Sequence, residues 1–343
     1  MKAIAKTRPE PGVEIVNVDE PVVGPGLVKL KLEAASVCGT DLHIYSWDSW
    51  AASRIKPPRI IGHEFCGTIT EVGEGVTERQ VGDFVSSESH IVCGHCKQCR
   101  SGQAHVCVNT VILGVDIDGG FAEYVVIPWA NARPTSRSIP KEIAAFQDAL
   151  GNAVHTAMAG PLEGRTVLIT GMGPIGLFAV GVCKAAGATK VIATEVSPFR
   201  INLAHEVGAD LVLSPKDGPL EPRILAAAGP DGIDATLEMS GHPSSLELAV
   251  SVTRPGGRIS LLGLYPDSVQ PVNINSVIFK GIDLQGIVGR RLWETWDQMG
   301  TLLESGKLNL WPVITHVMHY TEFQKAMELM KAGQAGKVVF TFE

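Results

Sequence analysis

The chain has 343 residues, of which 45% are hydrophobic and 19% are charged, and its formal net charge is -7. This size and composition are typical of a globular protein with about two domains. The acidic balance argues against a nucleic-acid-binding surface. No apolar run approaches the roughly 18 residues that a membrane-spanning helix needs, so we expect no membrane partner. The seven cysteines, four of them clustered, are not spaced like a secreted disulfide framework, which favours a reducing cytosol and metal thiolates.

The first 150 residues or so contain short runs of alternating apolar and polar residues, separated by turns rich in proline and glycine. The expected strands cover residues 13–16, 27–32, 66–72 and 122–127. Since no helical pattern alternates with these strands, we predict an antiparallel, barrel-like β domain over residues 1–150.

From residue 151 the pattern changes to alternating strands and helices. After a helix at 152–159, apolar strands of the buried parallel type are expected at 166–170, 190–194, 210–213, 232–238 and 258–262. Helices at 174–186 and 197–207 separate the first three, which predicts a parallel sheet with right-handed crossovers over 151–289. A helix at 293–303, a strand at 313–316, a helix at 321–331 and a strand at 337–341 follow. We expect residues 290–343 to return and complete the first domain.

The strongest local motif is a C-x2-C-x2-C-x7-C pattern formed by Cys93, Cys96, Cys99 and Cys107. Four thiols at this spacing can surround one tetrahedral zinc ion, and such a closed set leaves no position for a substrate. We therefore expect a structural zinc that holds a loop lacking its own core. Unliganded cysteines are one alternative. An iron–sulfur cluster, whose spacing overlaps, is the other, although no proline follows the last cysteine and no second cluster of cysteines is present. A zinc ribbon for nucleic acid disagrees with the acidic balance.

A G-x-G-x-x-G motif, with Gly171, Gly173 and Gly176, directly follows an expected strand and opens an expected helix. In that context the glycines would permit a tight turn, the approach of a pyrophosphate and close packing of helix on strand. The helix N-terminus would offer N–H groups to phosphate. Glu195 lies 19 residues beyond Gly176 and can accept both ribose hydroxyls while repelling a 2′-phosphate, so NAD is favoured over NADP. Arg200 could cover the adenine or ribose, or could equally be a solvated charge of the helix face.

Cys38, His63 and Glu64 offer one sulfur, one nitrogen and one oxygen. This mixed set suits a catalytic zinc that keeps a position for water or substrate. A lone His-Glu pair is more often solvated surface, and Cys38 upstream is what favours the metal.

Three further residues are candidates for proton transfer. Asp148 lies where the β domain meets the nucleotide domain, so it could bind zinc at times or hold a water and pass protons; its alternative role is a helix N-terminal cap. Thr40 could touch a metal-bound alcohol and His43 could carry the proton to solvent. Their alternatives are a turn-stabilising threonine and a surface histidine.

These patterns, in this order, resemble the zinc-dependent medium-chain alcohol dehydrogenase family over essentially the whole chain. Residues 62–76 match that family's zinc signature, Gly-His-Glu-x2-Gly-x5-Gly-x2-Val, without a departure. The resemblance implies an α/β protein, with a GroES-like β-barrel catalytic domain (1–150, completed by 290–343) and a Rossmann coenzyme domain (151–289). It also implies a homotetramer with one structural and one catalytic zinc per subunit. Similar family positions would put NAD on Ile175, Glu195, Arg200, Leu262, Gly263, Leu264, Ile287 and Val288.

Within the family, residues 38–48, 89–96, 151–157 and 289–296 are similar to the threonine-oxidising members. This implies oxidation of the β-hydroxyl of L-threonine to 2-amino-3-oxobutanoate. An amino-acid substrate needs partners for its carboxylate and ammonium. His90, Asn152 and Arg291 are the candidates, and each could instead be a loop or surface polar residue.

One residue departs from the threonine-oxidising pattern. Those members usually carry a proline where this chain has Ala149, and its loss relaxes the backbone next to Asp148, which leaves the placement of that carboxylate open. Two other functions remain open. A polyol or 2,3-butanediol dehydrogenase would use the same zinc and NAD, and a non-catalytic nucleotide-binding protein would keep the fold without turnover.

Overall fold

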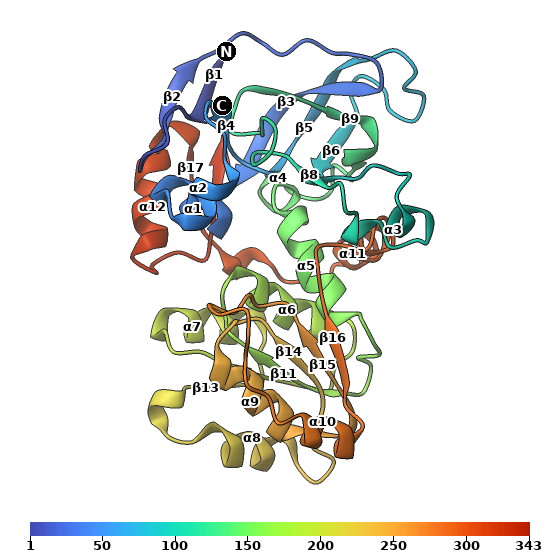
Figure 1. Cartoon of the computed structure of the whole chain (residues 1–343), viewed down its shortest axis with the longest axis vertical. Coiled ribbons are helices and arrows are strands. Elements are labelled where there is room, and N and C mark those ends of the chain that lie inside the picture. Colours follow the sequence, from blue (N-terminus) through green and yellow to red (C-terminus); the bar gives the residue numbers. More distant parts are fainter. The chain divides into compact units, whose positions relative to one another are not determined.

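The computed structural model describes all 343 residues, which form two units (Figure 1). Unit 1 comprises residues 1–149 and 314–343, and unit 2 comprises residues 150–313. None of the helices has the length and apolar character that crossing a bilayer requires.

Unit 1 is built mainly from antiparallel strands. Its largest sheet has the order β10-β6-β5-β3-β18-β17, and β9 also pairs with β3. The long strand β3 has three neighbours. Its first half pairs with β9 and its second half with β18, while β5 pairs along its whole length. The bounds are β3 (Leu27–Ser36), β5 (Glu64–Val72), β6 (Phe84–Ser87), β9 (Tyr124–Pro128), β10 (Ala132–Pro134), β17 (Ile314–His319) and β18 (Lys337–Thr341).

Smaller sheets and short helices complete unit 1. The order β2-β1-β4 forms a three-stranded sheet, and β7 pairs with β8. The predicted β domain is thus present, but two short helices after β3 were not expected from the sequence. The bounds are β1 (Lys2–Lys6), β2 (Glu14–Asn17), β4 (Arg59–Ile60), β7 (His90–Ile91), β8 (Val111–Ile112), α1 (Gly39–Ser46), α2 (Ser49–Arg54), α3 (Lys97–Arg100), α4 (Lys141–Ala144) and α12 (Phe323–Lys331).

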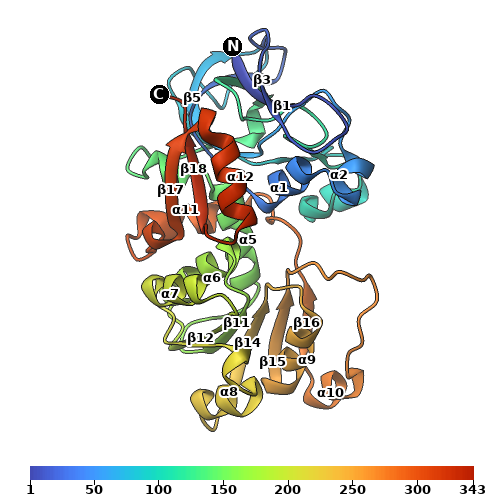
Figure 2. The ribbon, with the colours of Figure 1, turned by 90° about the vertical axis from the view of Figure 1, so that its left-hand side faces the viewer.

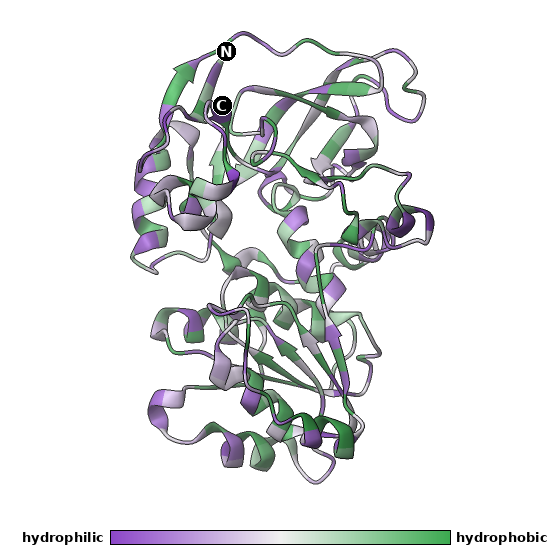
Figure 3. Cartoon of the chain, in the orientation of Figure 1, coloured by the Kyte–Doolittle hydropathy of each residue, from purple (hydrophilic) through white to green (hydrophobic).

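One strand pair in unit 1 departs from the antiparallel rule. Strands β17 and β18 are parallel, with Val317 opposite Val339. Parallel neighbours need a crossover, and α12 supplies it. This helix lies between β18 and α1 (Figure 2), and purple and green bands alternate along it in Figure 3 because its apolar face is turned inward.

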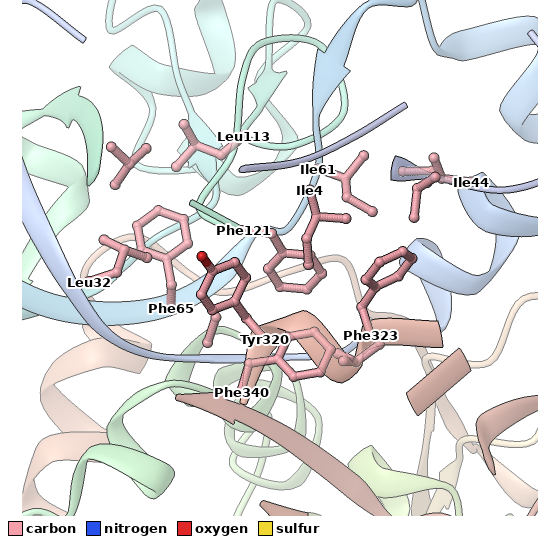
Figure 4. Close-up of a cluster of buried hydrophobic side chains, with 14 of the residues drawn as sticks. Ile4, Leu32, Ile44, Ile61, Phe65, Leu113, Phe121, Tyr320, Phe323 and Phe340 are labelled. Atoms are coloured by element: carbon pink, nitrogen blue, oxygen red, sulfur yellow. The ribbon is translucent and has the colours of Figure 1, made fainter. Parts of the chain in front are cut away.

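The core of unit 1 gathers aromatic and aliphatic side chains from the first strands, the middle of the sheet and the returning C-terminal segment (Figure 4). The rings of Phe121 and Phe340 meet edge to face with centroids 5.3 Å apart. Aromatic pairs at this distance add to the stabilisation that burial provides. The returning segment is therefore part of the core of unit 1 and not an appendage.

Unit 2 contains one all-parallel sheet of six strands in the order β13-β12-β11-β14-β15-β16. In chain order this is the 3-2-1-4-5-6 arrangement of a doubly wound dinucleotide-binding fold, so the predicted Rossmann fold is confirmed. The bounds are β11 (Thr166–Thr170), β12 (Lys190–Thr194), β13 (Leu211–Leu213), β14 (Ile233–Glu238), β15 (Thr253–Leu261) and β16 (Asp283–Gly286).

The helices of unit 2 cover both faces of this sheet. Two apolar clusters join alternate strand residues such as Leu168 and Ile259 to α8, α9 and α10. The residues between them, such as Val167 and Ile169, are also buried and point to the opposite face, where α6 packs. The bounds are α5 (Gln147–Ala157), α6 (Pro174–Ala185), α7 (Pro198–Val207), α8 (Leu220–Ala228), α9 (Pro243–Val252), α10 (Ile274–Lys280) and α11 (Glu294–Glu304).

Two expected boundaries were wrong. The helix expected at 152–159 begins at Gln147, so it already contains Asp148. The chain returns to unit 1 at Ile314 and not at residue 290. The reason is packing: a Cβ on Gly181 of α6 would lie 3.1 Å from Leu308, and the turn Trp311–Val313 packs on α6 and α7. The apolar face of the helix expected at 293–303 indicated burial but not which unit would bury it.

Candidate metal centres and nucleotide pocket

A mixed cluster brings together Cys38, His63 and Glu64, whose ligand atoms all lie within 4.8 Å of one another. Strand pairing explains how residues so far apart meet. Ser36, at the end of β3, is the register partner of Glu64, at the start of β5. Cys38 follows two residues later and precedes the first residue of α1. The sequence prediction that these three residues come together is met by this geometry.

Gly62 sets the direction in which His63 leaves its loop. Its φ of +90° lies in the left-handed region that favours glycine, and a Cβ there would sit 2.2 Å from the ring of Phe121. Any larger residue would collide with the core ring. The glycine of the His-Glu motif is therefore needed where the chain passes the core ring, one residue before His63.

A buried layer of polar side chains supports the mixed cluster. Ser36 Oγ donates to Glu64 Oε2, and the ammonium of Lys337 contacts the same oxygen. The backbone N–H of Cys38 donates to Asp41 Oδ2 at 2.9 Å, while Asp41 Oδ1 lies 3.8 Å from His63 Nδ1. Ser36, Asp41 and Lys337 are each no more than 2% exposed, so all three belong to the site.

Sequence reasoning missed these three supporting residues. Asp41 follows Cys38 by three residues, and a carboxylate that can orient a ligand histidine is a recognisable signal. Lys337 offered none, because 300 residues separate it from Val37, whose carbonyl its ammonium also contacts at 3.2 Å.

The charges of the mixed cluster attract one another strongly. Burial acts to lower the pKa of the His63 imidazole, but Cys38, Asp41 and Glu64 outweigh it and raise that pKa to about 10. Burial acts to raise the pKa of Glu64, and the positive charges of Lys337 and His63 bring it below its usual value. A metal ion would replace the His63 proton as the positive partner of the thiolate and carboxylate. One sulfur, one nitrogen and one oxygen so close together fit a zinc ion with a position left open.

The two relay candidates lie on the first turns of α1. Thr40 Oγ1 is 3.8 Å from Cys38 Sγ. His43, three residues further along the same helix face, has a side chain that is 58% exposed and pairs through Nδ1 with the Asp48 carboxylate. The backbone N–H of Ala51 and the His43 ring hold the pKa of the Asp48 carboxyl below its usual value, so the ring nitrogen is the donor in this contact. Of the two relay candidates, Thr40 therefore lies beside the mixed cluster and His43 lies at the solvent.

Asp148 is the second residue of α5, so it is not the cap that precedes the helix. Its Oδ1 accepts the N–H of Ser89 at 2.9 Å. This bond constrains the carboxylate although Ala149 stands in place of a proline. Asp148 is not a member of the group of ligand atoms formed by Cys38, His63 and Glu64. His90, the first of the substrate candidates, follows Ser89 in the chain and donates its backbone N–H to Glu88 Oε1 at 2.9 Å.

The other two substrate candidates lie in unit 2. Asn152 Oδ1 is 3.4 Å from Arg290 Nη1, whereas the side chain of Arg291 is 51% exposed and 3.9 Å from Glu294. Gly151 permits the Arg290 contact, since a Cβ at that position would lie 2.4 Å from Arg290 Cγ. The Gly-Asn pair is thus explained by the passage of Arg290, a residue that sequence reasoning did not single out.

The four cysteines of the local motif form a second cluster in unit 1. Sγ–Sγ separations are 3.4 Å between Cys96 and Cys99, 3.8 Å between Cys96 and Cys107, and 3.6 Å between Cys107 and Cys93. Four sulfurs at about 2.3 Å from one tetrahedral zinc would be about 3.8 Å apart. An iron–sulfur cluster places several irons and sulfides between its thiolates, and ligand atoms within 4.8 Å of one another leave no such space.

The thiols of this four-cysteine cluster also accept N–H groups. Cys96 N lies 3.4 Å from Cys93 Sγ, and Asn109 Nδ2 lies 3.5 Å from the same sulfur. The Asn109 bond is the main reason why the pKa of the Cys93 thiol falls to about 5. Donors aimed at sulfur favour thiolates, the form that binds metal.

Unit 2 carries a pocket of about 970 Å³ at the carboxyl ends of its strands, a size typical of ligand sites. Gly171, Gly173, Glu195 and Arg200 line it. A Cβ on Gly173 would meet nothing within 4 Å, which leaves room for a ligand against the backbone, whereas a Cβ on Gly176 would lie 2.0 Å from the carbonyl oxygen of Gly171. Gly176 is therefore required by the glycine turn and not, as the motif suggested, by the strand.

Glu195 directly follows β12, and its carboxylate connects the end of that strand to the glycine turn. Its Oε2 accepts Met172 N at 2.8 Å, and its Oε1 accepts Val196 N at 2.7 Å and Ser197 N at 3.0 Å. These bonds hold the carboxylate at the pocket. His242 also lines the pocket, and it was not identified from the sequence.

The remaining cofactor candidates do not line this pocket. Leu262, Gly263 and Leu264 follow β15, and Ile287 and Val288 follow β16. In a parallel sheet these carboxyl ends lie on the same edge as the glycine turn. Ile175 lies in the first turn of α6. The positions are those of a ligand that extends from the pocket along this edge.

Two protein-family domains match this chain, one in each unit. Residues 24–137 match the alcohol dehydrogenase GroES-like domain, and residues 174–305 match the zinc-binding dehydrogenase domain. L-threonine 3-dehydrogenase of Pyrococcus abyssi is 53% identical over 99% of this chain and 98% of its own length. The enzyme of that name from Xanthomonas oryzae is 45% identical over 100% of both.

Solved structures show the same fold. An alcohol dehydrogenase from Escherichia coli complexed with NADH has a TM-score of 0.91 at 31% identity, covering 100% of this chain and 99% of its own. The 2R,3R-butanediol dehydrogenase of Bacillus subtilis has a TM-score of 0.89 at 26% identity, covering 100% and 99%. By these matches, and by the mixed cluster and the nucleotide pocket, this chain belongs to the zinc-dependent medium-chain alcohol dehydrogenase family.

Proposed function

We propose that the chain is an NAD-dependent L-threonine 3-dehydrogenase that oxidises the β-hydroxyl of L-threonine to 2-amino-3-oxobutanoate. The observation that carries the proposal is the identity of 53% to a curated enzyme of that name across nearly the whole chain. The mixed cluster and the nucleotide pocket are the sites that this reaction needs. Glu195 at the pocket supports NAD as the acceptor, because a carboxylate there repels a 2′-phosphate.

When bound, zinc would polarise the substrate hydroxyl as a Lewis acid, and NAD⁺ would take a hydride from the carbinol carbon. Cys38 and His63 would hold the ion, with Glu64 as an exchangeable third donor. Cys93, Cys96, Cys99 and Cys107 would hold a second, structural ion. Balance requires that one hydride goes to NAD⁺ and one proton leaves the hydroxyl.

The chain itself would remove that proton. Thr40, next to Cys38, would accept it from the substrate hydroxyl, and His43 would receive it on the solvent side of α1. The Asp48 carboxylate beside His43 Nδ1 would stabilise the protonated ring. Asp148, constrained by Ser89, would assist.

The substrate carboxylate and ammonium would be met by His90, Asn152 and Arg291, of which Arg291 is the exposed cation. We also infer a homotetramer from the family resemblance.

A 2,3-butanediol or polyol dehydrogenase is the second candidate, favoured by the structural likeness to the Bacillus subtilis enzyme. A diol carries no charge, so it would not need the partners that the carboxylate and ammonium of an amino acid require. We call these partners, His90, Asn152 and Arg291, the clamp. The dependence of activity on the clamp therefore separates the two candidates.

The test is NADH formation followed at about 340 nm, the absorbance of the reduced nicotinamide. Zinc-loaded protein is given L-threonine, L-serine, sorbitol or 2,3-butanediol, with NAD⁺ and with NADP⁺. We expect the highest kcat/KM for L-threonine with NAD⁺. A higher value for a diol would assign the second candidate. No NADH from any substrate, with zinc and NAD⁺ shown to be bound, would contradict both.

A matched pair of variants sharpens the test. Arg291→Gln should raise KM for L-threonine more than it raises KM for 2,3-butanediol, because only the amino acid presents a carboxylate. Glu322→Gln removes a charge from a surface position of unit 1 and is the control. Equal effects of Arg291→Gln on both substrates would remove Arg291 from the clamp.

A further inference from the structure

A buried cation that is not a metal ligand lies beside the mixed cluster. Lys337 is 2% exposed, and its ammonium contacts Glu64 Oε2 and, at 3.2 Å, the carbonyl oxygen of Val37. Lysine is almost never fully buried unless it is paired. Its position against Glu64 therefore calls for an electrostatic explanation.

The charges of this region supply one. The deprotonated ligand set holds two anions, the Cys38 thiolate and the Glu64 carboxylate, and the Asp41 carboxylate adds a third. A divalent ion alone would leave one excess negative charge among buried groups. The Lys337 ammonium makes the sum zero, and it does so at the carboxylate of Glu64 and not at the sulfur or the imidazole.

The backbone fixes the ammonium in this place. Lys337 begins β18, two residues before Val339, which pairs with Ser36 on β3. Ser36 in turn is the register partner of Glu64 on β5. Three neighbouring strands thus set the distance between the ammonium and the carboxylate. Ser36 Oγ donates to the same carboxylate oxygen, so Oε2 is held from two sides.

We propose that Lys337 is a positioning residue that holds Glu64 by Oε2 and neutralises its charge, which keeps Glu64 a weak and exchangeable donor to the catalytic zinc. This inference rests on the proposed function for the presence of zinc. It differs from a general structural role, because it predicts that loss of the cation tightens metal binding. A carboxylate without its ammonium partner gains more from a divalent cation.

The test measures metal affinity and not turnover. Zinc release from wild type, Lys337→Met and Lys337→Arg is followed by competition with a coloured chelator. The four-cysteine cluster in the same molecule is the internal reference. We expect Lys337→Met to hold the catalytic zinc at least tenfold more tightly, the four-cysteine site to be unchanged, and Lys337→Arg to remain within about threefold of wild type. Cobalt(II) substituted at the catalytic site should show shifted visible bands in Lys337→Met, because Glu64 becomes a permanent ligand.

Two further variants keep the inference falsifiable. In a Glu64→Gln background, Lys337→Met should change the metal affinity less than threefold, since the carboxylate on which it acts is gone. If Lys337→Met does not fold, Lys337→Gln, which keeps a hydrogen-bond donor and loses the charge, carries the same expectation. An unchanged or weaker affinity in a folded variant overturns the role assigned to Lys337. Absence of threonine oxidation in wild type would overturn the proposed function instead, and would leave the metal measurement intact.

Discussion

The two cysteine-containing clusters of unit 1 differ in how the chain builds them. The four-cysteine cluster comes from one stretch, residues 93–107, and its hydrogen-bond donors are backbone groups and Asn109. The mixed cluster draws on β3, the start of α1, β5 and β18, and a layer of buried polar side chains supports it. A local spacing is sufficient for the first, whereas the second depends on strand register.

The difference teaches what each cluster is suited for. The four-cysteine cluster satisfies one ion completely with four like ligands, so its contribution is to hold a loop in place. The mixed cluster combines three kinds of donor with Lys337 and Asp41, whose charges adjust those donors. Metal chemistry is expected at the cluster whose mixed donors leave a position open, and stability is expected at the cluster whose four like donors close around the ion.

The largest expected effect separates catalysis from folding. Cys38→Ser should lower kcat/KM roughly 10³-fold or more, because the thiolate of the mixed cluster is lost. The melting temperature should stay close to that of wild type, and metal analysis should find one zinc fewer per chain. Cys183→Ala, at a buried cysteine of α6 outside both clusters, is the control. Retention of more than a tenth of the activity by Cys38→Ser would assign the chemistry elsewhere.

The second prediction removes one ligand of the four-cysteine cluster. Cys99→Ser should open the 93–107 segment, since three thiolates no longer close around an ion. Limited proteolysis should then cut this segment at least about tenfold faster than in wild type, while the mixed cluster keeps its metal. Cutting at the wild-type rate would mean that the segment is held without its ion.

The third expectation concerns pH in the metal-free protein. The pKa of His63 is raised from 6.5 to about 10, so the folded state favours the protonated ring. The stability from this group is fully present below about pH 6.5 and is lost as the pH rises toward 10. The melting temperature of metal-free wild type should therefore fall by about 5 °C more over this range than that of metal-free His63→Asn.

Zinc-loaded wild type is the control for the pH experiment, because the ion takes the place of the proton and removes this dependence. Parallel curves for metal-free wild type and His63→Asn would show that the raised pKa contributes nothing to stability.

The smallest expected effect tests one hydrogen bond of the four-cysteine cluster. Asn109→Ala should raise the pKa of the Cys93 thiol above its present value of about 5, because the Asn109 amide is the main cause of the depression. Zinc release to a chelator should become about threefold faster. Asn131→Ala would not serve as a control because Asn131 is buried and its amide donates to the carbonyls of Glu88 and His90. Gln98→Ala is the control, since it changes an amide of the same segment. Release as slow as in wild type would leave the backbone N–H groups as the only donors that matter.

The sequence was sufficient where chemistry follows local spacing. The cysteine motif, the glycine fingerprint with Glu195, and the parallel sheet of alternating strands and helices in unit 2 could all be predicted, because each depends on residues that are neighbours or on a regular alternation. Lys337 could not be predicted, since a lysine at the start of a strand is ordinary until the pairing of β18 with β3 is known. The point at which the chain returns to unit 1, Ile314, could not be predicted for a related reason. The amphipathic pattern of 293–303 shows that a face is buried but does not identify the surface that buries it.

The insertion of unit 2 within unit 1 has a consequence for the order in which the protein is made. A ribosome synthesises His63 and then β5, which begins with Glu64, and it makes all of residues 150–313 before β18 appears. At about 5–20 residues per second this interval lasts on the order of ten seconds. During that time the nascent chain presents the thiolate, the imidazole and the carboxylate without the ammonium of Lys337. The four-cysteine segment is already complete. The structural ion can therefore be captured early, while the mixed cluster reaches its final charge balance only when the sheet of unit 1 closes.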